Sequence, residues 1–192
     1  MNDLIFRNVN ILDGTGAPAF NGDVSVKEGR INEVGDVVEG LVSGGREIDA
    51  GGATLAPGLI DTHAHDDGAF FRHPGMEFKL AQGVTTVVSG NCGFSAIPAD
   101  PTQDSVAASG GILAGLEGQF TDLDGYFAAA LERGPAINNM MLVGHNTVRS
   151  LVMGGEKRAP TDTEIALMQQ HVSHALAQGA CGFSSGLIYR PG

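Results

Sequence analysis

Tryptophan is absent from this sequence of 192 residues, and cysteine occurs only twice, at Cys92 and Cys181. Two distant cysteines without a Cys-x-x-Cys pair exclude a disulfide framework and indicate a reducing, cytoplasmic compartment. Long apolar runs are also missing, since none approaches the roughly 18–20 residues of a membrane span. The first residues show no basic stretch followed by an apolar one, so we expect neither a signal peptide nor membrane association.

Basic residues are few: 11 Lys and Arg stand against 22 Asp and Glu, for a net charge of −11. A chain this acidic is repelled by phosphate backbones and anionic lipid surfaces, which argues against nucleic-acid partners. Charged residues make up only 17% and hydrophobic ones 42%, a balance typical of a folded chain. The 29 glycines are dispersed between apolar runs and indicate many tight turns.

Residues 1–56 contain short strand patterns and no convincing helical period. Asp23 to Lys27 alternates polar and apolar residues, and Glu28-Gly29 is a turn signal before a return strand. The Ser43-Gly44-Gly45 run indicates a further turn. We therefore predict a small β-sandwich or partial barrel over 1–56, with strands at 4–12, 23–27 and 30–35 and a further apolar segment, 42–48, that this turn interrupts.

Residues 57–192 alternate short apolar runs with helical stretches, which predicts an α/β fold with a parallel sheet. An eight-stranded βα barrel needs about 250 residues. The sequence therefore predicts only the first four βα units, about half of a barrel. The expected strands lie near 59–60, 84–88, 137–143 and 180–184, and the expected helices at 74–82, 122–133 and 161–178.

His63 and His65 stand two apart after the first apolar strand of this second region. Residues i and i+2 of a strand point to one face, so both imidazoles could reach one metal ion. The carboxyl end of a parallel strand is also where α/β proteins place their active sites. The pair is either a metal site or two polar residues of a loop.

Cys92 lies in the segment Ser89-Gly90-Asn91-Cys92-Gly93-Phe94-Ser95, at the end of the next strand. A lone cysteine is often buried and inert, but a thiolate is a competent zinc ligand. With two histidines expected on the adjacent strand, we interpret Cys92 as the third ligand. Cys181 lies early in its strand and is predicted to be a core residue.

Other polar residues near strand ends give weaker signals. His145 follows the third strand and could hydrogen-bond a substrate or have a structural role, and the sequence leaves both open. Ile188 and Tyr189, after the fourth strand, could line an apolar substrate pocket. Ser184 has a Gly-x-Ser-x-Gly spacing, but no helix opens after it, so we do not interpret it as a nucleophile.

The segment Leu55 to His65 (LAPGLIDTHAH) resembles the first-strand signature of the amidohydrolase superfamily. Gly90 to Ser95 resembles the corresponding segment of the D-aminoacylases, the N-acyl-D-amino-acid deacylases, and the segments 143–149 and 185–192 fit the same family. The resemblance covers essentially the whole chain. It implies a metal-bearing βα (TIM-like) barrel preceded by a small β-sandwich.

The same resemblance implies Zn²⁺ bound through His63, His65 and Cys92. In the family, a metal-activated water attacks the amide of a small-molecule N-acyl-D-amino acid and releases a carboxylate and a free D-amino acid. The family's further metal histidines and catalytic aspartate come from later strands, beyond residue 192. We therefore expect no catalytic residue within this chain, no activity of the chain alone, and a need for the rest of the barrel or for self-association.

Two other functions compete with this hypothesis. One is an amidohydrolase acting on cyclic amides, similar to dihydropyrimidinase, which would use a carboxylated lysine as a bridging ligand. No lysine stands at the end of a strand predicted within 57–192, the region that would form the barrel. The other is a non-catalytic truncated product or structural subunit with a vestigial site.

Overall fold

The structure is a computed structural model that describes residues 1–100, 113, 116 and 120–189. Contacts divide the chain into two compact units, Met1–Pro57 and Gly58–Gly192. The end of the predicted segment 185–192, from residue 190 onward, lies outside the described residues. No helix in the described part is long and apolar enough to cross a membrane.

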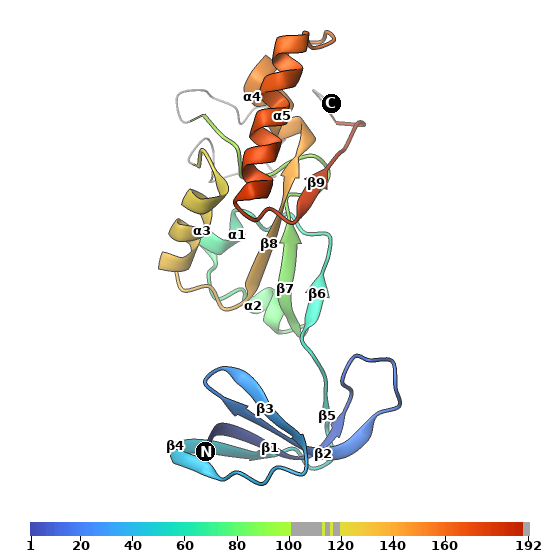
Figure 1. Cartoon of the computed structure of the whole chain (residues 1–192), viewed down its shortest axis with the longest axis vertical. Coiled ribbons are helices and arrows are strands. Elements are labelled where there is room, and N and C mark those ends of the chain that lie inside the picture. Colours follow the sequence, from blue (N-terminus) through green and yellow to red (C-terminus); the bar gives the residue numbers. More distant parts are fainter. Residues whose placement is uncertain (101–112, 114–115, 117–119, 190–192) are drawn as a thin grey trace. The chain divides into compact units, whose positions relative to one another are not determined.

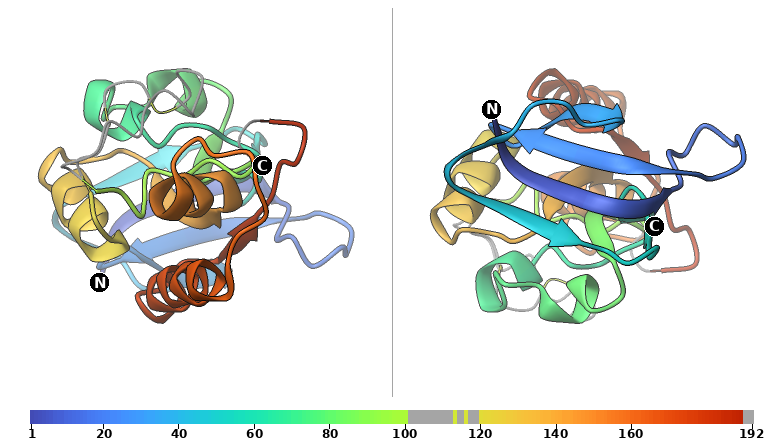
Figure 2. Two further views of the ribbon diagram at one scale, coloured as in Figure 1. Left: turned by 90° about the horizontal axis from the view of Figure 1, so that it is seen from above. Right: turned by 90° about the horizontal axis from the view of Figure 1, so that it is seen from below.

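The first unit is a single sheet in which β1 is central and pairs with three strands. Its order is β3-β2-β1-β4, and β5 also pairs with β1, as the view from below in Figure 2 shows for the longer strands. β2 runs antiparallel to β1 and β3, whereas β4 and β5 run parallel to β1. The strands are β1 (Asn2–Ile11), β2 (Phe20–Lys27), β3 (Arg30–Gly35), β4 (Leu41–Asp49) and β5 (Thr54–Leu55).

Turn chemistry explains how this sheet is formed. The predicted turn at Glu28-Gly29 is present, with φ of 51° and 72°, and it joins β2 to β3 as a tight hairpin. The turn predicted at residues 43–45 is wrong, because β4 continues through it. Gly44 adopts a φ of 83°, and the register against β1 shifts there, so the glycine forms a bulge rather than a reversal.

The predicted β-sandwich is not confirmed, because the described residues of the first unit form one sheet rather than two packed layers. One face carries a small apolar cluster around Val9, Ile11 and Val24, each almost fully buried. The partly buried Phe6 and Leu55 pack against this cluster. A strand alternation in the sequence specifies a half-buried sheet but does not say how many layers it forms.

The second unit contains a four-stranded sheet of order β6-β7-β8-β9, in which all neighbours are parallel (Figure 1). This confirms the predicted alternation of strands and helices. Successive strands lie side by side, so their carboxyl ends meet at one edge of the sheet. The strands are β6 (Leu59–Asp61), β7 (Val84–Ser89), β8 (Asn138–Gly144) and β9 (Gly182–Ser184).

The helices between these strands only partly follow the prediction. The helix expected at 74–82 is confirmed only over Glu77–Leu80, because Met76, with a φ of 46°, prevents a helix from running through from Pro74. A helix directly after β8 was missed by the sequence analysis. The helices are α1 (Ala69–Arg72), α2 (Glu77–Leu80), α3 (Leu123–Glu132), α4 (His145–Met153) and α5 (Asp162–Ala177).

The core of the second unit lies between the sheet and these helices and includes the fully buried Phe70, Ile97 and Tyr126. α5 lies beside α4 (Figure 2, left) and contributes Met168 and Val172 to this core. Three other apolar residues of α5 are substantially exposed, namely Ile165, Leu167 and Leu176. Cys181 is exposed too, so its predicted core role is wrong; it stands just before β9, at the edge of the described sheet.

Candidate metal centre

Three of the predicted site residues come together at the carboxyl ends of β6 and β7. His63 and His65 follow the end of β6, and Cys92 lies three residues beyond the end of β7. His63 Nε2 is 3.2 Å from Cys92 Sγ. One potential ligand atom from each of the three residues lies within 4.8 Å of the other two. His63 is exposed, whereas His65 and Cys92 are half-buried.

The loop that carries Cys92 has an unusual backbone. Gly90, Cys92 and Gly93 have φ values of 77°, 55° and 82°, all in the left-handed region. Such a conformation is uncommon for a residue with a side chain. At Gly90 a Cβ would collide with the carbonyl oxygen of Leu142, on the neighbouring strand β8. The glycines therefore let the loop approach β8 closely and turn the Cys92 thiol toward the histidines.

A buried carboxylate joins the histidine loop to the cysteine loop. Asp67 is fully buried; its Oδ1 accepts the Ala96 N–H at 2.9 Å and its Oδ2 accepts the Gly90 N–H at 3.3 Å. The Tyr126 hydroxyl donates to the Asp67 carbonyl at 2.8 Å. Burial raises the pKa of Asp67 to about 6, although the backbone N–H donors oppose this rise. Asp67 thus ties the segment after His65 to both flanks of Cys92.

Ser184, at the end of β9, holds the cysteine loop from the other side. Its hydroxyl donates to the Gly90 carbonyl and accepts the Gly93 N–H at 2.9 Å. With both roles of the hydroxyl used by backbone, Ser184 is a structural residue here. Asp67 and Ser184 were both missed by sequence reasoning, because their roles depend on contacts between distant segments.

The electrostatics of the histidine pair suit a metal ligand. Burial, and to a lesser degree the neighbouring His63, lower the pKa of His65 and favour its neutral form. His65 Nδ1 is buried and has no hydrogen-bond partner in the described part of the chain. Neutral imidazoles and a thiolate are a donor set that Zn²⁺ accepts readily. The residues present therefore fit this ion.

The residues predicted to contact substrate lie outside the group of three. His145 is the first residue of α4, its Nδ1 is buried without a partner among the described atoms, and burial lowers its pKa. Its ring is 6.3 Å from that of Phe183. The Tyr189 ring packs 5.6 Å from that of Phe94, and Ile188 is 88% exposed. Their contact with a substrate remains a prediction.

The parallel sheet with helical connections carries its His-x-His and Cys cluster at the carboxyl edge, which is where βα proteins place their functional sites. The model of the amidohydrolase family matches residues 46–177. The chain belongs to this family.

Two relatives show which members of the amidohydrolase family the chain resembles. The chain is 41% identical over 190 residues to an N-acyl-D-glutamate deacylase of Alcaligenes xylosoxydans xylosoxydans, with 99% of this chain and 38% of the relative covered. It is 42% identical to an N-acyl-D-aspartate deacylase of the same organism, with 98% and 37% covered. The chain thus spans well under half of the length of these relatives.

A solved structure shows the same arrangement of the chain. It is the N-acyl-D-glutamate deacylase of Bordetella bronchiseptica in complex with zinc and a phosphonate inhibitor that mimics the tetrahedral intermediate. The match has a TM-score of 0.88 and 42% identity, and it covers 100% of this chain and 40% of that one. The fold of the chain is therefore that of an amidohydrolase.

Proposed function

We propose that this chain carries part of the zinc site of an N-acyl-D-amino-acid deacylase. The observation that carries the proposal is the convergence of His63, His65 and Cys92, with one potential ligand atom from each within 4.8 Å of the others. The relatives named above, which are deacylases of N-acyl-D-glutamate and N-acyl-D-aspartate, support this substrate class. In this proposal the binding partner of the protein is its small-molecule substrate, and the protein acts in the cytoplasm.

In this proposal His63, His65 and Cys92 hold the ion. Bound zinc polarises an amide carbonyl and lowers the pKa of a bound water toward 7. Cys92 brings one negative charge, and the two imidazoles are neutral, so the site keeps the ion electrophilic. His145, Ile188 and Tyr189 contact the substrate. The proton-transfer aspartate belongs to a later strand, beyond residue 192, and the chain alone is inactive.

The parallel sheet is, in the same proposal, the first half of a closed βα barrel, and the N-terminal sheet is one layer of the β-sandwich. Parallel sheets are normally covered on both faces. Here four apolar strand residues are about half exposed or more, which supports a missing cover. They are Leu59 (59%), Ile60 (60%), Met140 (47%) and Phe183 (49%).

The test compares Cys92→Ala with Cys181→Ala in the complete protein. We expect Cys92→Ala to lose bound zinc and deacylation of N-acetyl-D-glutamate and N-acetyl-D-aspartate, because the thiolate ligand is gone. Cys181→Ala should retain both, since that cysteine is exposed and outside the group. Retained zinc and turnover in Cys92→Ala would contradict the ligand role. Hydrolysis of a dihydropyrimidine without deacylation would contradict the substrate class.

A further inference from the structure

Lys79 lies against the segment that carries both histidines. Its Nζ is 2.7 Å from Asp61 Oδ2 and 2.8 Å from Asp66 Oδ2. Asp61 ends β6 just before the histidines, and Asp66 directly follows His65. The side chains of Lys79, Asp61 and Asp66 are only 15%, 31% and 17% exposed. One ammonium group thus joins the carboxylates on both sides of the His-x-His pair.

The contact reaches His63 through Asp61. Asp61 Oδ1 accepts the His63 backbone N–H at 3.1 Å, while Asp61 Oδ2 accepts from Lys79. Both oxygens of this carboxylate are therefore engaged, one by the histidine backbone and one by the lysine. The carboxylate cannot rotate toward one partner without losing the other.

Lys79 stands on a short helix that is anchored at its start. It belongs to α2, which packs against β7, the strand that leads to Cys92. Met76, at the start of α2, is fully buried, and its carbonyl accepts the Lys79 N–H at 2.9 Å. Because α2 contacts β7, Lys79 connects the segment after β6 to β7 through its ion pairs.

We propose that Lys79 is a positioning residue of the metal centre, which holds the histidine segment in register with Cys92 by pairing with Asp61 and Asp66. This inference rests on the proposed function, since it concerns the same zinc site. Two effects of removing the lysine oppose each other. Losing a positive charge beside the site favours the binding of a cation. Losing the ion pairs from Lys79 to Asp61 and Asp66, which we call the clamp, frees the histidines to move. Hydrogen-bond partners of metal ligands typically contribute 10- to 100-fold in metal affinity. Lys79 acts one contact further out, through Asp61 and the His63 backbone, so we expect its contribution at the lower end of this range.

The test measures zinc affinity in the complete protein by competition with a chelator of known affinity. We expect Lys79→Met to weaken zinc binding by about tenfold, the lower end of the range for direct partners of metal ligands. Lys79→Arg keeps the charge and can span both carboxylates, so it should stay within about threefold of the wild type. Lys157→Met removes an exposed lysine from the loop before α5 and serves as the matched control, with unchanged affinity. Co²⁺ substitution reports the ligand geometry, and its absorption bands should change only in Lys79→Met.

Tighter or unchanged zinc binding in a folded Lys79→Met would overturn the clamp, and so would equal losses in Lys79→Met and Lys157→Met. If Lys79→Met does not fold by circular dichroism, Asp66→Asn replaces it. That variant leaves the Asp61 contact intact and should weaken the affinity for zinc by a few-fold; no loss of affinity would again overturn the clamp.

Failure of the wild type to bind zinc, or zinc binding that is unchanged in Cys92→Ala, would overturn the proposed function together with the clamp. Loss in Cys92→Ala with no loss in Lys79→Met overturns the clamp alone.

Discussion

Left-handed backbone conformations concentrate in the few residues around Cys92. Gly90 and Gly93 can adopt them without a steric penalty, and Cys92 is held in one by its neighbours. The loop also passes so close to β8 and β9 that side chains are excluded at several points. A Cβ on Gly144 would strike Gly93, and one on Gly186 would strike Cys92 itself. The thiol is placed by backbone packing as much as by its own rotamer.

Gly90→Ala should therefore be one of the most damaging small substitutions in the chain. Its new Cβ would meet the Leu142 carbonyl oxygen, and its φ of 77° is unfavourable for alanine. We expect a loss of about 2–4 kcal/mol in the free energy of unfolding, measured by urea denaturation. Gly155→Ala is the control, since a Cβ there meets nothing within 4 Å, and it should change stability by less than about 0.5 kcal/mol. Equal effects of the two would contradict this account.

The chemistry-bearing residues of the site were predictable, and the residues that hold them were not. His63, His65 and Cys92 stand at the ends of recognisable strands, and their side chains are typical zinc ligands. Asp67 and Lys79 have no local signature, because their partners lie on other segments: Ala96 and Gly90 for Asp67, and Asp61 for Lys79. Polar contacts between distant segments depend on tertiary structure that spacing does not encode.

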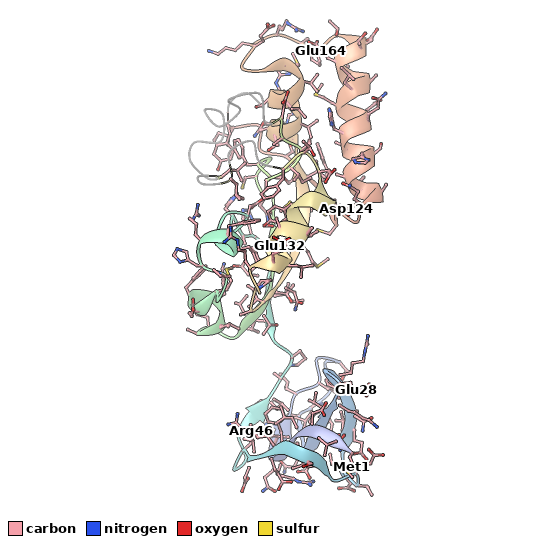
Figure 3. All side chains as sticks on the ribbon, turned by 90° about the vertical axis from the view of Figure 1, so that its left-hand side faces the viewer. Met1, Glu28, Arg46, Asp124, Glu132 and Glu164 are labelled. Atoms are coloured by element: carbon pink, nitrogen blue, oxygen red, sulfur yellow. The ribbon has the colours of Figure 1, made fainter. Side chains whose placement is uncertain are left out.

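At the scale of elements, α5 has the most explicit signal for its own start. The Thr161 hydroxyl accepts the Glu164 N–H at 3.3 Å, and the Glu164 carboxylate accepts the Thr161 N–H at 2.7 Å, which together form a capping box. Arg158 adds two contacts to the same carboxylate. Figure 3 labels Glu164 at this end of α5.

Thr161→Ala should destabilise the second unit by about 1 kcal/mol, because the Glu164 N–H in the first turn of α5 loses its acceptor. Thr163→Ala is the matched control: Thr163 is exposed within the first turn, and alanine is the better helix former there. The expected result is a lower urea midpoint for Thr161→Ala with an unchanged slope. A control variant that loses as much stability would show that the cap is not the cause.

The same cap makes stability depend on acid. Hydrogen bonds from Arg158, and then from Thr161, lower the pKa of Glu164 to about 2 from its ordinary 4.5. Between these values the unfolded chain binds more protons than the folded one, so stability falls as the pH drops from about 4.5 toward 2. The contribution is fully present above pH 4.5.

Unfolding of Glu164→Gln across this pH range provides the measurement. The variant should be less stable than the wild type at pH 6, and the difference should shrink steadily and vanish near pH 2. Glu132→Gln, on the exposed end of α3 (Figure 3), is the control and should track the wild type. A difference that stays constant from pH 6 to pH 2 would contradict the linkage.

Elements with strong local signals were predicted well and those without them were not. The β-branched run of β7 and the capped α5 are both present. α4 was missed because its first residues, His145 to Thr147, read as a loop after a strand. The helix expected at 74–82 forms only over Glu77–Leu80, because Met76 adopts a left-handed conformation that its residue type does not predict. Tertiary contacts decide such positions.

At the scale of the whole molecule, all three candidate ligands lie in the second unit, Gly58–Gly192. The parallel order of its four strands follows from the alternation of strands and helices. The layer structure of the first unit was not predictable, because alternation along a strand fixes only which face is apolar.

Zinc should therefore protect the two units unequally against hydrogen exchange. At 100 times its dissociation constant, a bound ligand adds about 2.7 kcal/mol of stability to the unit that binds it. We expect slower exchange at Ala64 and Ala96, whose N–H groups bond to Val88 and Asp67 beside the site. Asn10, whose N–H bonds to Ala53 in the first unit, should not change. Equal protection of the amides in the two units, or no protection of any of them, would contradict the assignment of the site.

The spacing of the three donors along the chain has a consequence for how metal is acquired. The two imidazoles are near neighbours, but the thiol comes 29 residues after His63. An unfolded chain can offer zinc only the local pair, since bringing in the sulfur would also require closing that long loop. In the proposed site, full affinity for zinc thus requires β6 and β7 to be aligned, so zinc capture would be a late event and tightly held zinc a sign that the two strands have already paired.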